Sequence, residues 1–147
     1  MGEVIARRGQ VRRPSLSASV VYESADAGDG MIASARDFTA DFLTAAPAGG
    51  GRSVSRERVD IARLVVSELV TNAVRHAPGP CRVLLELFED ALEISVFDGL
   101  DVSPVPRAHD PRRIGQHGVE IVLAVCESVS VEPQPPGKRV RARLSLA

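Results

Sequence analysis

The chain has 147 residues, of which 44% are hydrophobic and 25% charged, and its formal net charge at pH 7 is -1. This length and composition suit one globular domain that buries about two thirds of its unfolded surface. The near-neutral charge gives no indication of a nucleic-acid-binding or membrane-surface protein, and no apolar run approaches the roughly 18 residues that span a bilayer.

The N-terminal residues predict a tail rather than a targeting signal. Residues 1–14 carry four arginines with no apolar segment behind them, a pattern that does not fit a secretory signal peptide. We therefore expect a flexible basic tail over 1–14 and one domain over 15–147, in the cytoplasm. Cys81 and Cys126 have no second cysteine or histidine at ligand spacing, so both are expected to be buried, reduced thiols.

The first half of the domain predicts a strand and two helices. Residues 15–22 read as a weak strand. From residue 31 onward, apolar side chains recur at helical spacing until Pro47, at Met31, Ala35, Phe38 and Phe42. Ser53 or Ser55 can cap a second helix, which we expect over residues 56–77.

The second half predicts two hairpins separated by an irregular stretch and a short helix. In the first hairpin, two residues, Glu89 and Asp90, form the turn. The expected segments are, in chain order, strands over 82–88 and 91–98, a polar, proline-rich segment over 99–111, a helix over 119–127, and strands over 128–132 and 139–146.

The last strand indicates the architecture. Its side chains alternate between an apolar set and a polar set, namely Val140, Ala142, Leu144 and Leu146 against Arg139, Arg141, Arg143 and Ser145. One face of the sheet is therefore packed and the other faces water, which is typical of a largely antiparallel sheet covered by helices on one side. The predicted fold class is an α/β two-layer sandwich.

Two polar residues interrupt the apolar side of the second helix. At about 100° per residue, Glu68 and Asn72 lie one turn apart inside a hydrophobic arc, which comprises Ile61, Leu64, Val65, Leu69, Val70 and Ala73. Burying such a pair costs several kcal/mol unless something binds it. Either these side chains bond to backbone or lie at a solvated rim, or they face a hard cation such as Mg²⁺ or a water.

Asp98 places a carboxylate on the inward side of its strand. It continues the parity of the apolar residues before it and is followed at once by Gly99. Such a carboxylate can accept a hydrogen bond from an exocyclic amine such as that of adenine. An Asx-type turn or a helix cap is the alternative.

Gly115 and Gly118 lie directly before the short helix over 119–127. Glycines at a helix start let backbone N–H groups approach an anion, and the helix dipole adds to the attraction. A glycine pair alone is common, but together with the acid–amide pair and Asp98 it supplies metal, base and phosphate contacts for one nucleotide.

Four segments, in this order, resemble the ATP-binding domain shared by gyrase, MutL, sensor histidine kinases and the heat-shock chaperone ATPases. The likeness extends to the anti-sigma-factor serine kinases and their actinobacterial relatives, and it covers about residues 15–146. It implies a Bergerat-type fold with a mostly antiparallel, mixed sheet. The segments are the N box LVVSELVTNAVRHA (64–77), the glycine boxes EISVFDG (93–99) and GQHGVEIV (115–122), and the final strand GKRVRARL (137–144).

The resemblance implies roles by position for the residues of the first two boxes. Asn72 would bind Mg²⁺, and Glu68 would orient or deprotonate the attacking group. Asp98, together with Gly99, would hold the adenine amine of ATP.

The resemblance also implies a lid over residues 99–117. Gly115 and Gly118 would let this lid close over the phosphates, and Arg113 would be a phosphate contact, as would Arg107 and Arg112. The remaining histidines, His109 and His117, are expected to be solvent or lid residues, as is His76.

The implied function is a serine/threonine protein kinase that binds a sigma factor and phosphorylates an antagonist protein, and so regulates transcription. The alternative is a non-catalytic nucleotide-binding module that only holds a regulator. A histidine kinase core fits less well, because His76 lies inside the N box. The helix over 31–43 and the outer arginine face of the sheet are expected to be available for homodimer or partner contacts.

Overall fold

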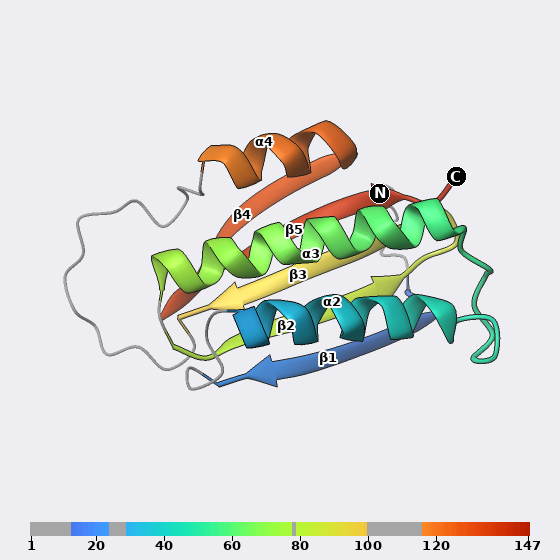
Figure 1. Cartoon of the computed structure of the whole chain (residues 1–147), viewed down its shortest axis with the longest axis horizontal. Helices are drawn as coiled ribbons and strands as arrows, with labels where there is room; N and C mark the ends of the chain where they lie inside the picture. Colours follow the sequence, from blue (N-terminus) through green and yellow to red (C-terminus); the bar gives the residue numbers. More distant parts are fainter. Residues whose placement is uncertain (1–12, 24–28, 78, 100–115) are drawn as a thin grey trace, which may run out of the picture.

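A computed structural model describes residues 13–23, 29–77, 79–99 and 116–147 of the chain. The elements in this part of the chain are shown in Figure 1. In chain order they are β1 (Leu16–Tyr22), α2 (Asp29–Thr44), α3 (Arg56–His76), β2 (Cys81–Leu87), β3 (Ala91–Asp98), α4 (Gln116–Val125), β4 (Ser128–Gln134) and β5 (Gly137–Ser145).

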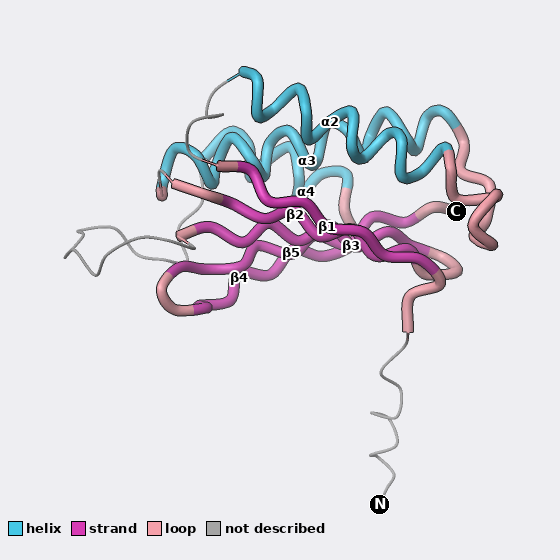
Figure 2. The backbone as a smooth tube through the Cα atoms, turned by 90° about the horizontal axis from the view of Figure 1, so that it is seen from below, coloured by secondary structure: helices cyan, strands magenta, loops and turns pink. Residues whose placement is uncertain are grey.

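The described strands form one sheet in the order β1-β2-β3-β5-β4, and each neighbouring pair within it is antiparallel. The helices cover one face of this sheet (Figure 2). This arrangement confirms the predicted α/β two-layer sandwich. The two-residue turn at Glu89-Asp90 is also confirmed, since the Phe88 N–H donates to the Ala91 carbonyl at 2.8 Å.

The core lies between the sheet and the helices. The alternation predicted for the last strand is confirmed, because Val140, Ala142 and Leu144 are buried at 4% exposure or less. Such alternation gives the sheet one packed face. The largest fully buried side chains come from both layers: Met31, Leu43, Val65, Val66, Val70, Val83, Leu85, Leu87, Leu92, Ile94, Val96 and Leu144.

Helix α3 has defined signals at both ends. Ser55 is its N-cap, with the Ser55 side chain accepting from the Arg58 N–H at 3.2 Å. Arg75 lies in the last turn, where its positive charge interacts favourably with the helix dipole. The predicted apolar arc is wrong at one position, because Leu64 is 40% exposed. The buried face of α3 therefore includes Val65, Val66 and Leu69, and the side of the helix that carries Leu64 is exposed to solvent.

Some boundaries differ from those predicted. Helix α4 begins at Gln116, so Gly118 lies in its first turn rather than before it. Strand β4 reaches Gln134, which pairs with Gly137 and shortens the expected connection. The predicted tail over 1–14 falls almost wholly outside the described residues. Among the helices of the described part, none is long and apolar enough to cross a membrane.

The end of β3 and the start of β5 approach each other through two glycines. Gly99 has a φ of +68°, and a Cβ added to it would lie 2.7 Å from the Gly137 Cα. A Cβ added to Gly137 would overlap the Asp98 carbonyl oxygen. Only residues without a side chain allow this approach, because neither neighbour is a flexible group that can move aside.

We predict that Gly137→Ala lowers the free energy of unfolding by about 2–3 kcal/mol, because the added methyl group collides with backbone. Urea denaturation measures the change. Gly30→Ala is the matched control, since a Cβ at Gly30 in α2 has no atom within 4 Å. The control should leave stability unchanged or raise it by up to about 1 kcal/mol. Equal stabilities of the two variants would contradict the glycine contact.

Candidate functional site

The elements that carry the predicted site residues meet at one end of the sheet. In Figure 1 the C-terminal end of α3, the end of β3, the start of β5 and the start of α4 all lie at the left of the view. Asn72 is in the last turns of α3, Asp98 ends β3 and Gly118 is in the first turn of α4. The fold therefore brings the three predicted sets of contacts to the same end of the molecule.

Glu68 and Asn72 differ in burial, although both lie on α3. Asn72 is 7% exposed and belongs to the buried polar residues of the protein. Glu68 is half-buried, and within the described residues it makes no hydrogen bond or ion pair. Glu68 therefore lies at the rim of the packed layer, which was one of the alternatives for this pair. Asn72 places its amide on the packed side of the helix.

Asp98 is buried, at 4% exposure, and both of its carboxylate oxygens accept hydrogen bonds from Lys138. The Lys138 backbone N–H donates to Oδ1 at 3.1 Å, and the ammonium forms an ion pair with Oδ2. The two residues are register partners in the β3–β5 ladder. Asp98 is therefore held by a residue of the neighbouring strand rather than by an Asx-type turn or a helix cap.

Lys138 also lies at this end, although it was not among the predicted site residues. It is 3% exposed, and buried lysines are rare unless they are paired. The alternation along β5 could have indicated its burial, because Lys138 lies on the same inward-facing side of the strand as Val140 and Ala142. Asp98 lies on the inward-facing side of β3 in the same way. Lys138 is also the single lysine of the chain.

Cys81 lies near this carboxylate. Burial and, to a smaller extent, the charge of Asp98 raise the pKa of the Cys81 thiol to about 11. The thiol is therefore protonated at neutral pH. Cys81 is buried, as predicted, and its Sγ lies 3.7 Å from the Met31 sulfur. Cys126 is only partly buried, which corrects the prediction, although burial also raises its pKa to about 11.

Several predicted residues lie outside the described part of the chain. These are Gly115, Arg107, Arg112, Arg113 and His109. Gly118 is described, and its place in the first turn of α4 still suits an anion contact. The first four N–H groups of a helix have no partner within the helix, so the backbone N–H groups there can donate to a ligand.

The donor set at this end suits one kind of metal. Among the described residues, no group of three or more His, Cys, Asp or Glu side chains could hold a metal ion. Mg²⁺ takes oxygen ligands and usually keeps several waters and substrate phosphates, with only one or two protein side chains. The amide oxygen of Asn72 fits an ion that nucleotide phosphates carry in, and a fully protein-bound metal is not expected from the described residues.

The outer face of the sheet carries the three arginines of β5, and each has an acceptor within the chain. Arg139 donates to the Ser95 Oγ, and its guanidinium lies 5.0 Å from the centre of the Phe97 ring. Arg141 pairs with Glu132 at 2.6 Å. The third arginine, Arg143, contacts Asp90, Glu93 and Glu127 at 3.0–3.2 Å. A partner would therefore meet a face whose charges are largely balanced.

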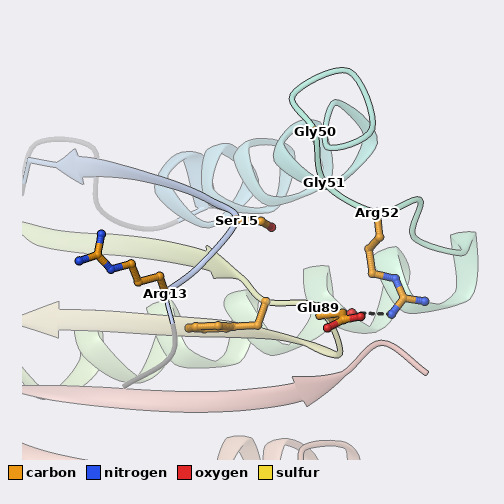
Figure 3. A pocket seen from close by; sticks show the side chains of 7 residues that line it. Arg13, Ser15, Gly50, Gly51, Arg52 and Glu89 are labelled. Atoms are coloured by element: carbon orange, nitrogen blue, oxygen red, sulfur yellow. Dashed lines mark hydrogen bonds between the residues drawn. The ribbon is translucent and has the colours of Figure 1, made fainter. Parts of the chain in front are cut away.

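An open pocket of about 520 Å³ lies at the opposite end of the sheet (Figure 3). There the Arg52 guanidinium donates to the Glu89 carbonyl oxygen at 2.7 Å, and the side chains of Arg13 and Arg52 do not converge. Because β3 separates this end from Asp98, the pocket is roughly 20 Å from the carboxylate. It is lined by Arg13, Ser15, Gly50, Gly51, Arg52, Phe88 and Glu89, and it is not part of the predicted site.

The chain is similar to a known protein family. The sequence model of a family described as histidine kinase-like ATPase domain matches residues 32–144, which is more than half of the chain. Among curated proteins, none matches the chain. The family match implies ATP binding, and the matched range includes α3, β3 and most of β5.

We predict that the Asp98–Lys138 pair stabilises this end of the fold as a unit. Asp98→Asn or Lys138→Met should each lower the free energy of unfolding by about 3 kcal/mol, because each leaves one buried charge without its partner. The double variant should lose less than the sum of the two losses. Thermal and urea unfolding of the four proteins measure this coupling, and strictly additive losses would contradict a direct pair.

Proposed function

Since the chain belongs to the histidine kinase-like ATPase domain family, we propose that it is an ATP- and Mg²⁺-dependent regulatory protein kinase. Its acceptor would be a serine or threonine hydroxyl of an antagonist protein, and its regulated partner a sigma factor. Phosphorylation of the antagonist would decide whether this chain holds the sigma factor. The proposal thus joins nucleotide binding at one end of the sheet to protein binding elsewhere on the chain.

The observation that carries the proposal is the placement of Glu68. Its carboxylate is half-buried one turn before the buried Asn72, and it makes no hydrogen bond or ion pair within the described residues. A carboxylate that has no partner among the described residues, one turn from a predicted metal ligand, would be available to accept a proton. A general base must reach the hydroxyl it deprotonates, and the half-buried position of Glu68 leaves part of its side chain accessible.

The proposed step is a phosphoryl transfer. The acceptor hydroxyl oxygen forms a bond to the γ-phosphorus, the bond from that phosphorus to the β–γ bridging oxygen breaks, and ADP leaves with the electron pair. Glu68 takes the hydroxyl proton. When bound, Mg²⁺ supplies neutralisation of phosphate charge. Asn72 would provide an oxygen ligand for it, and the N–H groups at the start of α4 would orient the phosphates.

One observation favours a second candidate, a nucleotide-responsive binding module that transfers nothing. Both oxygens of Asp98 are held by Lys138, so base recognition must compete with an interaction inside the protein. Weak nucleotide binding suits a module that responds to ATP better than it suits efficient turnover. In both candidates ATP binds at this end, and they differ only in whether a phosphoryl group reaches the partner.

We predict that Asn72→Ala abolishes Mg²⁺-dependent ATP binding, because it removes the only side-chain oxygen assigned to the ion. Isothermal titration calorimetry with and without Mg²⁺ measures the loss. Thr71→Ala is the neighbouring control, since the Thr71 hydroxyl donates to the Ser67 carbonyl within α3. Unchanged affinity in Asn72→Ala, with the fold intact by circular dichroism, would overturn the assignment.

We predict that Glu68→Gln retains ATP binding and lowers phosphoryl transfer about 10²- to 10⁴-fold, because the amide cannot accept the hydroxyl proton. Transfer of ³²P from ATP to a co-encoded antagonist measures the rate. Glu57→Gln, which changes an exposed carboxylate in the first turn of the same helix, should transfer at the wild-type rate. Wild-type protein that binds ATP but labels no antagonist would favour the binding module.

A further inference from the structure

The pairing of Lys138 with Asp98 has a consequence for nucleotide recognition, and this inference rests on the proposed function. Asp98 is the carboxylate assigned to the exocyclic amine of adenine. In the structure its Oδ1 accepts from the Lys138 N–H and its Oδ2 from the Lys138 ammonium. The base and the lysine side chain therefore seek the same oxygen.

Burial makes this competition steric as well as electrostatic. Asp98 is 4% exposed and Lys138 is 3% exposed. A carboxylate has about four lone-pair sites, so hydrogen-bonding capacity alone would allow a third donor. A third donor would not reach the carboxylate, however, because the Asp98 side chain is only 4% exposed while Lys138 is paired with it.

We propose that Lys138 is an intramolecular competitor of the adenine amine, and that it sets the affinity of this chain for ATP. The backbone N–H of Lys138 stays on Oδ1 because the β3–β5 register holds it there. The ammonium is on a flexible four-carbon stem, so it leaves Oδ2 when the base binds. The amine then takes its place, and the ammonium moves to solvent or to an anionic group of the nucleotide.

The first test uses wild-type protein and the fact that the sequence holds one lysine. An N-hydroxysuccinimide ester labels amines, and peptide mass spectrometry separates Lys138 from the N-terminal amine. Without nucleotide, Lys138 should react far more slowly than the N-terminus. Saturating Mg²⁺-ATP should raise its rate several-fold. A rate that stays unchanged while calorimetry records ATP binding would overturn the inference and leave the proposed function standing.

The second test removes the ammonium and keeps most of the stem. Lys138→Met should bind ATP about tenfold more tightly, which corresponds to about 1.4 kcal/mol, because no internal cation holds Oδ2. The gain should be absent for purine riboside triphosphate, which lacks the exocyclic amine.

Arg141→Met is the matched control. This substitution also removes a positive charge from β5, but Arg141 pairs with Glu132 on the outer face of the sheet and not with Asp98. The ATP affinity of this variant should equal that of the wild type. A similar gain in both variants would show a general charge effect and would overturn the inference.

The remaining outcomes also decide. Weaker ATP binding by Lys138→Met would make the lysine a contact of the base or phosphates instead of a competitor, and an equal gain for both triphosphates would place its effect away from the amine. Either result overturns the inference with the proposed function intact. If neither wild type nor variant binds ATP, the nucleotide site itself is wrong and both proposals fail.

Discussion

The approach of β3 to β5 is the constraint on which the candidate site depends. Gly99 and Gly137 allow the two backbones to come together, and a Cβ at either position would strike backbone atoms. This approach brings Asp98 opposite Lys138 in the ladder, and burial then favours their pairing, since an isolated buried charge is costly. The pairing of β3 with β5 thus also brings Lys138 onto the carboxylate that a nucleotide base would use in the proposed site.

The features that were predicted correctly from the sequence depend on residues a few positions apart in the chain. The alternation along β5, the cap at Ser55 and the turn at Glu89-Asp90 each involve residues a few positions apart, and all are confirmed. Asp98 was singled out in the same way, as a carboxylate on an apolar parity, and its burial agrees. Periodicity shows which face a residue occupies, because helices and strands have fixed repeats.

The features that were missed depend on distant contacts. The Asp98–Lys138 pair joins residues 40 positions apart, and only the strand register reveals it. Leu64 was placed in the core because the helical wheel shows hydrophobicity, not which side of α3 meets the sheet. Gly118 was placed before α4, because the helix was expected to start with the apolar residues from Val119 onward. The helix begins three residues earlier, at Gln116, and includes Gly118 in its first turn.

Polar residues on core-facing positions fall into two groups at this end of the molecule. Asp98 and Lys138 satisfy each other, so their pairing contributes to the fold before any ligand arrives. Glu68 is half-buried and has no hydrogen-bond or ion-pair partner among the described residues. In the proposed function, stability and chemistry would therefore depend on different carboxylates. Any ligand that used Asp98 would have to exchange one partner for another, so its affinity would be a difference between two interactions. The proposed proton transfer to Glu68 would disturb no hydrogen bond or ion pair of that side chain within the described residues.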